Sequence, residues 1–236
     1  MFDAHCHLQL EPQYSDADGV MMRAGSERVD KLVCAGTSES DWNDVASLSN
    51  RFKEVIPSFG LHPWYVSERS EQWLNELESL LLDYPGSGVG EIGLDHAVSV
   101  RNDDEQEQVF REQLDLAVKL KRPISIHCVK AWGAMLKILR EYYPLEFGFM
   151  IHAYSGSEET LREIMELDGY VSFADAHQVA ASVASDRLLV ETDEDEPCNM
   201  KHVVEDVAVL RGISAEELAR QTAENASRLF RTANER

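Results

Sequence analysis

Two kinds of segment alternate along the chain. Short runs rich in apolar and β-branched residues occur eight times, at 2–8, 29–37, 54–63, 88–95, 123–128, 147–155, 170–174 and 187–193. Stretches with apolar residues at helical spacing separate many of them, at 39–52, 71–84, 105–121, 131–143, 157–168 and 214–233. Ser214, with Glu217 three residues later, is a capping-box pattern that predicts the start of the last helix. Residues 175–186 are compatible with either a helix or an irregular loop.

Strands that alternate with helices indicate a parallel sheet. Eight strands, with no Gly-x-Gly-x-x-Gly turn after the first, favour a closed (β/α)8 TIM barrel over an open sheet. The 236 residues suit one such barrel and contain no long linker, low-complexity tract or clear repeat. We therefore predict an α/β protein with a single domain over residues 1–236.

Composition adds a strong charge imbalance to this picture. Lys and Arg total 22 against 43 Asp and Glu, which gives a net charge of -21. Such a field opposes the binding of a polyanion, and it suits a site that depends on bound cations. Four cysteines without a C-x-x-C pair read as reduced thiols. With no signal peptide or membrane-spanning run in the sequence, we expect a cytoplasmic protein, with a nuclear location also open and no obligate protein partner evident.

The first predicted strand contains "DAHCHL", in which polar and apolar residues alternate one for one. Side chains alternate faces along a strand, so Asp3, His5 and His7 are predicted to share one face. In a barrel this face would point inward near the mouth, while the apolar residues between them pack under the helices. An isolated H-x-H pair is equally compatible with two core histidines that have hydrogen-bond partners.

Polar residues also close other predicted strands. The ends of the strands supply Glu91 and Asp95 in "GEIGLD", His127 in "SIHC", His152 in "MIHAYSG" and Asp193 in "VETD". Imidazole and carboxylate groups are ligands for divalent ions. The candidate metal ligands are His5, His7, Glu91, His127, His152 and Asp193. Six are too many for one ion that keeps room for water, but enough for two ions that share a carboxylate and activate water for hydrolysis.

A resemblance to a known family supports this prediction. The motifs "DAHCHL", "FGLHPW", "GEIGLD", "ISIHCVKAW", "HAYSGS" and "LLVETD" follow the order and approximate spacing of the TatD family of metal-dependent hydrolases, DNase-like members of the amidohydrolase superfamily. The resemblance runs from residue 2 to about 193 and resumes at 224–230. It implies an amidohydrolase-like barrel that hydrolyses phosphodiester bonds of DNA with two divalent ions, either Mg²⁺, Mn²⁺ or Zn²⁺.

The resemblance also implies a role for each candidate ligand. His5, His7 and Asp193 would hold one ion, His127 and His152 the other, and Glu91 would bridge both. Asp193 and Glu91 are thus the predicted catalytic residues, with Asp193 accepting a proton from the attacking water.

Four more residues are predicted to contact substrate: His62, Lys130, Asp95 and Tyr154. The first two stand where the family has groups that orient a phosphate. Lys130 is equally compatible with a solvated lysine at a helix start, and it stands where many relatives have Arg.

One departure from the family pattern leaves the substrate open. Glu194, Asp195 and Glu196 follow Asp193 directly. They would repel a phosphodiester unless they point away or are neutralised, or they form an exposed acidic turn without catalytic effect. Three functions therefore remain: a DNase, a metal-dependent hydrolase of a small ester, amide or lactone, and a non-catalytic binding protein that retains the fold. The complete ligand set argues against the third.

Overall fold

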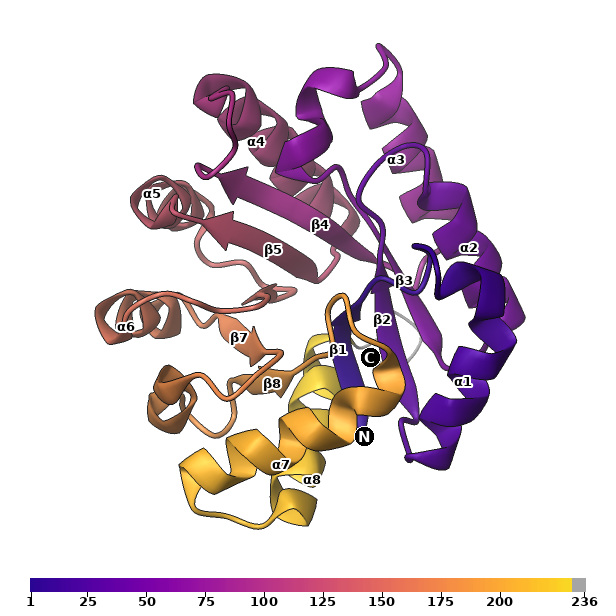
Figure 1. Ribbon diagram of the computed structural model, residues 1–236. Coiled ribbons are helices and arrows are strands. Elements are labelled where there is room, and N and C mark those ends of the chain that lie inside the picture. Colours follow the sequence, from indigo (N-terminus) through magenta and orange to yellow (C-terminus); the bar gives the residue numbers. More distant parts are fainter. Residues whose placement is uncertain (231–236) are drawn as a thin grey trace.

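The computed structural model describes residues 1–230, in which eight parallel strands pair in sequence order around one ring (Figure 1). The strands are β1 (Phe2–Cys6), β2 (Lys31–Ala35), β3 (Val55–Phe59), β4 (Gly88–Asp95), β5 (Ile124–Val129), β6 (Phe149–Ile151), β7 (Tyr170–Phe173) and β8 (Leu188–Val190). All carboxyl ends of the strands point to the same end of the ring, because every pairing is parallel.

The ring closes where the chain leaves β8 and passes β1. The backbone N–H of Asp193 donates to the carbonyl of His5 at 3.0 Å. The carboxylate of Asp3 accepts two hydrogen bonds from Thr192, from the backbone N–H at 3.0 Å and from Oγ1 at 2.5 Å. These contacts complete the predicted (β/α)8 barrel.

Helices lie outside the ring (Figure 1). They are α1 (Ala17–Ser26), α2 (Trp42–Arg51), α3 (Trp73–Asp83), α4 (Asp103–Leu120), α5 (Trp132–Tyr142), α6 (Glu158–Glu166), α7 (Met200–Arg211) and α8 (Ala215–Leu229). The predicted start of the last helix is confirmed, because Ser214 Oγ accepts a hydrogen bond from the N–H of Glu217 at 3.2 Å. Residues 231–233 of that predicted helix lie outside the described residues.

The observed elements differ from the predicted ones mainly at their ends. The predicted strands 147–155 and 187–193 shrink to three paired residues each, because the chain beyond β6 and β8 turns into loops at the barrel mouth. Residues 175–186 contain a short 3-10 helix, η3 (Gln178–Ser182), where a regular barrel has an α-helix. Helices α1 and α7 lie outside the predicted helical stretches.

A β-bulge interrupts the alternation of β1. Asp3 pairs with Leu32 and Cys6 with Cys34, so three steps along β1 face two along β2. Paired residues on parallel strands share a face, and Asp3 therefore lies on the side of Cys6. The prediction that Asp3 shares the face of His5 is wrong for this reason.

A second bulge lies in β4. Val89 pairs with Ile124 and Ile92 with Ile126, which again leaves one extra residue on the first strand of the pair. Glu91 falls within this irregular stretch. Bulges re-aim a side chain relative to a regular strand, and in this barrel one bulge contains His5 and the other contains Glu91.

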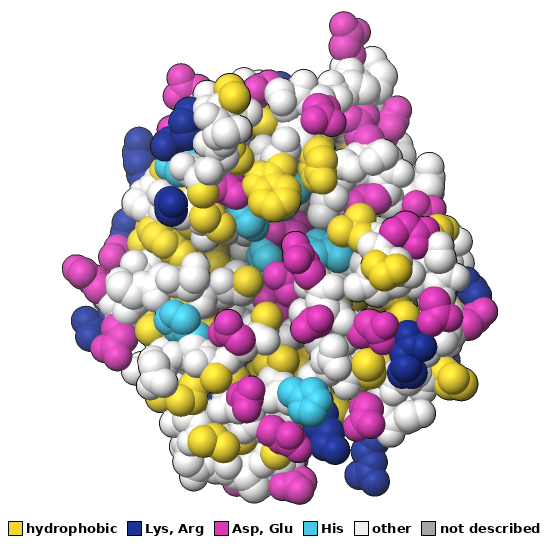
Figure 2. Space-filling model, in the orientation of Figure 1, with side chains coloured by type: hydrophobic (Ala, Val, Ile, Leu, Met, Phe, Trp, Pro, Cys, Tyr) yellow, Lys and Arg dark blue, Asp and Glu magenta, His cyan; other side chains and the backbone are white. Residues whose placement is uncertain are grey.

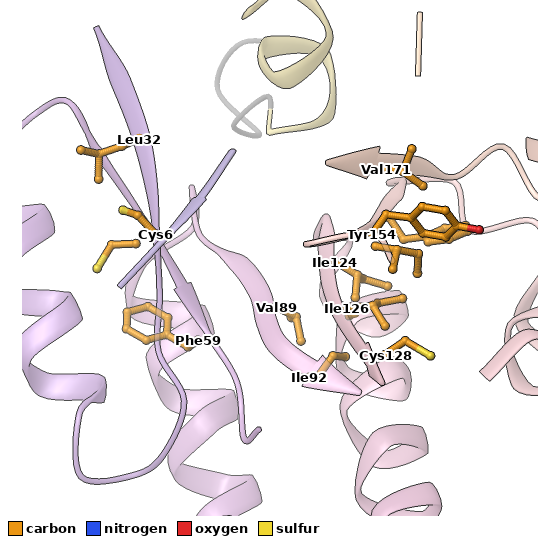
Figure 3. Close-up of a cluster of buried hydrophobic side chains, with 14 of the residues drawn as sticks. Cys6, Leu32, Phe59, Val89, Ile92, Ile124, Ile126, Cys128, Tyr154 and Val171 are labelled. Atoms are coloured by element: carbon orange, nitrogen blue, oxygen red, sulfur yellow. The ribbon is translucent and has the colours of Figure 1, made fainter. Parts of the chain in front are cut away.

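The main apolar core fills the space between the sheet and the helices. Figure 3 shows part of it, including Leu32, Phe59, Ile126 and Val171, all of which are almost fully buried. Burial of each such side chain stabilises the fold by about 1.5–3 kcal/mol. Among residues 1–230, no helix is both long enough and apolar enough to cross a membrane.

Candidate active site

The six candidate ligands converge at the carboxyl ends of the strands. Figure 2 shows histidine and acidic side chains gathered at the centre of this face of the molecule. They come from five strands and the loops that follow them: His5 in β1 and His7 just after it, Glu91 within β4, His127 in β5, His152 after β6 and Asp193 after β8. In (β/α)8 enzymes, catalytic residues come from this end of the barrel.

Glu91 stands at the centre of the group. Its Oε2 lies 3.3 Å from Nε2 of both His5 and His7. Its Oε1 faces three other rings, at 2.7 Å from His152 Nε2, 2.9 Å from His127 Nδ1 and 3.2 Å from His62 Nε2. The two carboxylate oxygens therefore face two different sets of imidazoles.

The charges of the group are strongly coupled. Burial raises the pKa of Glu91, but the imidazoles around it, led by His152 and His62, hold that pKa well below its usual range. Burial lowers the pKa of His7, whereas its contacts with Asp193 and Glu91 raise it to about 10. Burial raises the pKa of Asp193, and the neighbouring imidazoles, led by His7, lower it to about 2. Glu91 and Asp193 are thus ionised, and positive charge between them stabilises both carboxylates.

The positions of the imidazole nitrogens around Glu91 fit a bound cation. His5 Nε2 and His7 Nε2 are 3.4 Å apart, and His127 Nδ1 and His152 Nε2 are 3.3 Å apart. Two imidazole nitrogens at such distances repel each other unless a proton or a metal ion lies between their lone pairs. The donor set of imidazoles and carboxylates is the one that divalent transition ions accept.

Three sets of donor atoms among residues 1–230 lie within 4.8 Å of one another. They are His5, His7 and Asp193; His62, Glu91 and His127; and His5, His152 and Glu191. The first set is the one that the resemblance implies for one ion. The second contains His62, which the sequence motifs suggest as a phosphate contact, and which is buried against Glu91 instead of standing in the open mouth.

Polar groups on the far side of the His5 and His7 rings fix the orientation of these rings. His5 Nδ1 lies 2.9 Å from Ser125 Oγ, and His7 Nδ1 lies 2.9 Å from the carbonyl oxygen of Ala35. These contacts turn Nε2 of both rings toward Glu91. A partner on the far nitrogen is the usual way in which a protein fixes the orientation of a metal-binding histidine.

Glu191 is a buried acid that does not appear among the predicted site residues. Its Oε1 accepts a hydrogen bond from the N–H of Ala153 at 2.6 Å and lies 3.5 Å from His152 Nδ1. Its Oε2 accepts a hydrogen bond from Ser172 Oγ. The only signal in the sequence is an acid that directly follows the apolar run of β8, two residues before Asp193.

Of two further predicted substrate contacts, Asp95 touches the group and Lys130 is exposed to solvent. Asp95 Oδ2 is 3.2 Å from His127 Nε2 and accepts a hydrogen bond from Trp64 Nε1 at 2.6 Å. Burial raises the pKa of Asp95, but these two partners hold it below its usual range. Lys130 is exposed at the end of β5, with a left-handed backbone at φ 54°.

Tyr154 does not join the group. Its ring is buried against Trp132 and Phe173 in the apolar core, where Figure 3 shows it beside β7. Its hydroxyl donates to the carbonyl of Ser157 at 2.6 Å. Tyr154 follows His152 by only two residues, but β6 ends at Ile151 and the chain turns before Tyr154 is reached.

The acidic turn after Asp193 is partly neutralised. Arg23 on α1 forms two hydrogen bonds with the carboxylate of Glu196, at 2.9 and 3.1 Å, and also contacts Asp16 at 3.0 Å. Glu194 and Asp195 are exposed. One of the three extra carboxylates is therefore bound to α1, and two remain in solvent.

The (β/α)8 barrel and this group of imidazoles and carboxylates at its mouth define a metal-dependent hydrolase. The model of the family described as TatD related DNase matches residues 2–231, and the chain belongs to that family. This confirms the family and the class of enzyme predicted from the motifs.

Individual relatives cover nearly the whole chain. YabD of Bacillus subtilis, named an uncharacterized metal-dependent hydrolase, is 31% identical over 252 residues that cover 98% of this chain and 99% of YabD. TatD of Erwinia tasmaniensis, named a 3'-5' ssDNA/RNA exonuclease, is 29% identical, with 98% and 99% covered. The crystal structure of YJJV, a TatD homologue of Escherichia coli K12, superposes with a TM-score of 0.92 at 24% identity, covering 98% of this chain and 97% of YJJV, which shows the shared fold.

Proposed function

We propose that the protein is a phosphodiesterase that removes nucleotides from single-stranded DNA or RNA with the help of two divalent ions. The observation that carries the proposal is the convergence of Glu91 with five imidazoles and Asp193 at the barrel mouth. The name of the Erwinia tasmaniensis relative supports the substrate class.

The two oxygens of Glu91 suggest how two ions are held. We propose that Oε2, His5, His7 and Asp193 hold one ion, while Oε1, His127 and His152 hold the other. His62 completes the second set or contacts the phosphate. Bound divalent ions lower the pKa of a coordinated water toward neutrality and polarise phosphoryl oxygens. Imidazole-rich sites suit Zn²⁺ or Mn²⁺, and Mg²⁺ competes by abundance.

Asp193 is the proposed proton acceptor. Its side chain is 26% exposed, whereas that of Glu91 is only 3% exposed, so the attacking water reaches Asp193 more readily than Glu91. Its left-handed backbone, at φ 57°, turns the carboxylate toward His7, with Oδ1 at 3.4 Å from Nε2. An ionised carboxylate in this position takes the proton of the attacking water. Lys130 adds a point charge for a phosphate at the rim.

The test uses protein freed of metal by chelation and then reloaded separately with Mg²⁺, Mn²⁺ or Zn²⁺. End-labelled single-stranded DNA, RNA and duplex DNA are incubated with each form, and the products are separated by length. We expect successive loss of single nucleotides from single strands, which Asp193→Asn reduces by about 100-fold or more. Asp195→Asn, which removes an exposed acid two residues away, serves as the matched control and should keep full activity.

Two outcomes contradict the proposal. No cleavage by any metal-loaded form excludes a nuclease, and undiminished cleavage by Asp193→Asn indicates a contaminating enzyme. The exposed carboxylates of Glu194 and Asp195, with a net charge of -21, favour a neutral ester, amide or lactone as the second candidate substrate. Metal-dependent turnover of such compounds without cleavage of nucleic acid would decide for it. Failure to bind any divalent ion while folded would indicate a binding protein.

A further inference from the structure

Beside the proposed metal site stands an exposed tryptophan. Trp64 lies in the short 3-10 helix η2 (Pro63–Glu68), two residues after His62. It is 55% exposed, whereas Trp42 and Trp73 are buried. Figure 2 shows hydrophobic side chains beside the histidines at the centre of this face. A large aromatic side chain left open to water at the edge of a catalytic site is a marker of binding.

The indole of Trp64 is held at one edge. Its Nε1 donates to Asp95 Oδ2 at 2.6 Å, and Asp95 in turn accepts a hydrogen bond from the N–H of Ala97 at 2.7 Å. The ring meets that of His62 edge to face, with centroids 4.8 Å apart, and its centroid lies 6.3 Å from that of His127. The ring is therefore oriented before any ligand arrives, which lowers the entropy lost on binding.

A cavity of about 480 Å³ opens beside the exposed indole. Trp64 and Val100 contribute apolar surface, Asn102 a neutral polar group, and Asp95 and Glu105 carboxylates. Neither lysine nor arginine is among the described residues that line it. This lining disfavours a phosphate and suits a flat neutral ring with hydrogen-bonding edges.

We propose that Trp64 is the platform on which the base of the nucleotide beside the scissile phosphate stacks. This inference rests on the proposed nuclease function and names the part of the substrate that the site recognises. In a chain with a net charge of -21, contacts to phosphates supply little affinity, and stacking of bases on an aromatic ring replaces them. Bases within a duplex are already stacked on one another, so this platform selects single strands.

The decisive test combines removal of the indole with removal of the base. Single-stranded DNA with a normal or an abasic residue at each of its last positions is given to the wild type and to Trp64→Ala. For the wild type, we expect loss of one particular base to lower kcat/KM by roughly 5- to 100-fold, mainly through KM. Trp64→Ala should show a similar loss on normal DNA and almost no further loss on the abasic strand.

If the losses in kcat/KM caused by Trp64→Ala and by removal of the base simply multiply, the inference is overturned, because multiplying effects show that the two groups do not interact. Trp64→Phe keeps an aromatic face without the bond to Asp95, and it should retain part of the dependence on the base. Tyr143→Ala removes another exposed aromatic ring, 48% exposed at the opposite end of the barrel, and it should leave both substrates unaffected.

A binding measurement separates this inference from the nuclease proposal. Oligothymidine added to the metal-free protein should quench the indole fluorescence of the wild type but not that of Trp64→Phe, because Trp42 and Trp73 are buried and the partly buried Trp132 packs its ring against Tyr154. If the wild type cleaves nucleic acid with no dependence on the base, or if quenching persists in Trp64→Phe, stacking on Trp64 is refuted and the nuclease proposal stands. If quenching is lost in the variant but no form cleaves nucleic acid, the nuclease proposal fails alone.

Discussion

Replacing Glu191 by Gln tests whether a buried carboxylate behind His152 supports metal binding. Glu191 is fully buried, and its two oxygens accept hydrogen bonds from the N–H of Ala153 and from Ser172 Oγ. Within the described residues, His152 Nδ1 makes no hydrogen bond, and Glu191 Oε1 lies 3.5 Å away. The substitution conserves shape but removes the charge that faces this ring.

Two separate magnitudes follow from these contacts. The oxygen of Gln can accept from the N–H of Ala153 while its NH₂ group donates to Ser172 Oγ, so two hydrogen bonds to a charged group become neutral ones. The weakening of each bond costs about 1 kcal/mol of unfolding free energy, and the two together lower Tm by roughly 4–8 °C in a chain of this size. Loss of the partner behind a metal-binding histidine weakens metal affinity by about 10- to 100-fold.

The assay measures both quantities on metal-free protein. Thermal unfolding followed by circular dichroism gives Tm, and titration with Zn²⁺ or Mn²⁺ against a chelating indicator gives the Kd of the metal. Ser172→Ala is the matched control, because it removes one hydrogen bond to Glu191 and leaves the charge that faces His152. We expect the control to lose stability with a metal affinity near that of the wild type. Metal affinity of Glu191→Gln within twofold of that of Ser172→Ala would refute the reasoning and leave Glu191 a purely structural residue.

Three further predictions concern stability and metal binding. Asp3→Ala leaves two buried donors of Thr192 without acceptors, and we expect chemical denaturation to show a loss of about 2–6 kcal/mol; a loss below 1 kcal/mol would contradict the role of this pair in closing the barrel. The pKa of His7 rises from 6.5 to about 10 on folding, so protonated His7 stabilises the metal-free protein fully below pH 6.5, and this stabilisation is lost as the pH rises through 10. A Tm of the wild type that stays constant across this range, as that of His7→Gln does, would contradict this prediction. Arg23→Ala breaks a half-exposed ion pair with Glu196, and its Tm should stay close to that of the wild type, whereas a large drop would show that the acidic turn depends on α1.

The sequence predicts the barrel and the convergence of its His, Glu and Asp side chains well because both depend on local information. A strand that ends in His, Glu or Asp places that residue at the carboxyl edge whatever the rest of the fold does, and in a parallel barrel all these edges meet. For this reason Glu91 and Asp193 could be placed in one group although β4 and β8 are far apart in the chain.

The features of the site that the sequence could not predict depend on pairing between strands. The alternation of "DAHCHL" is perfect in the sequence, and only the register against β2 reveals that Asp3 has changed face. Glu191 and Asp193 are both acidic residues of "VETD" and look alike in the sequence. The closure of β8 against β1 determines that Glu191 is buried behind His152 and that Asp193 reaches the mouth. Tyr154 was misplaced for a related reason, because the point where β6 stops pairing is not encoded in its own residues.

The contact that closes the barrel also orders events in time. Asp3 and Thr192, whose hydrogen bonds join the two ends of the sheet, stand 189 positions apart in the chain. His5 and Asp193 lie within two residues of this pair along the chain, and they therefore come together only after nearly the whole protein has left the ribosome. Contacts of such long range form late and slowly. The ion that we propose both residues hold can therefore bind only once the barrel is complete, because a partly synthesised chain cannot form this site.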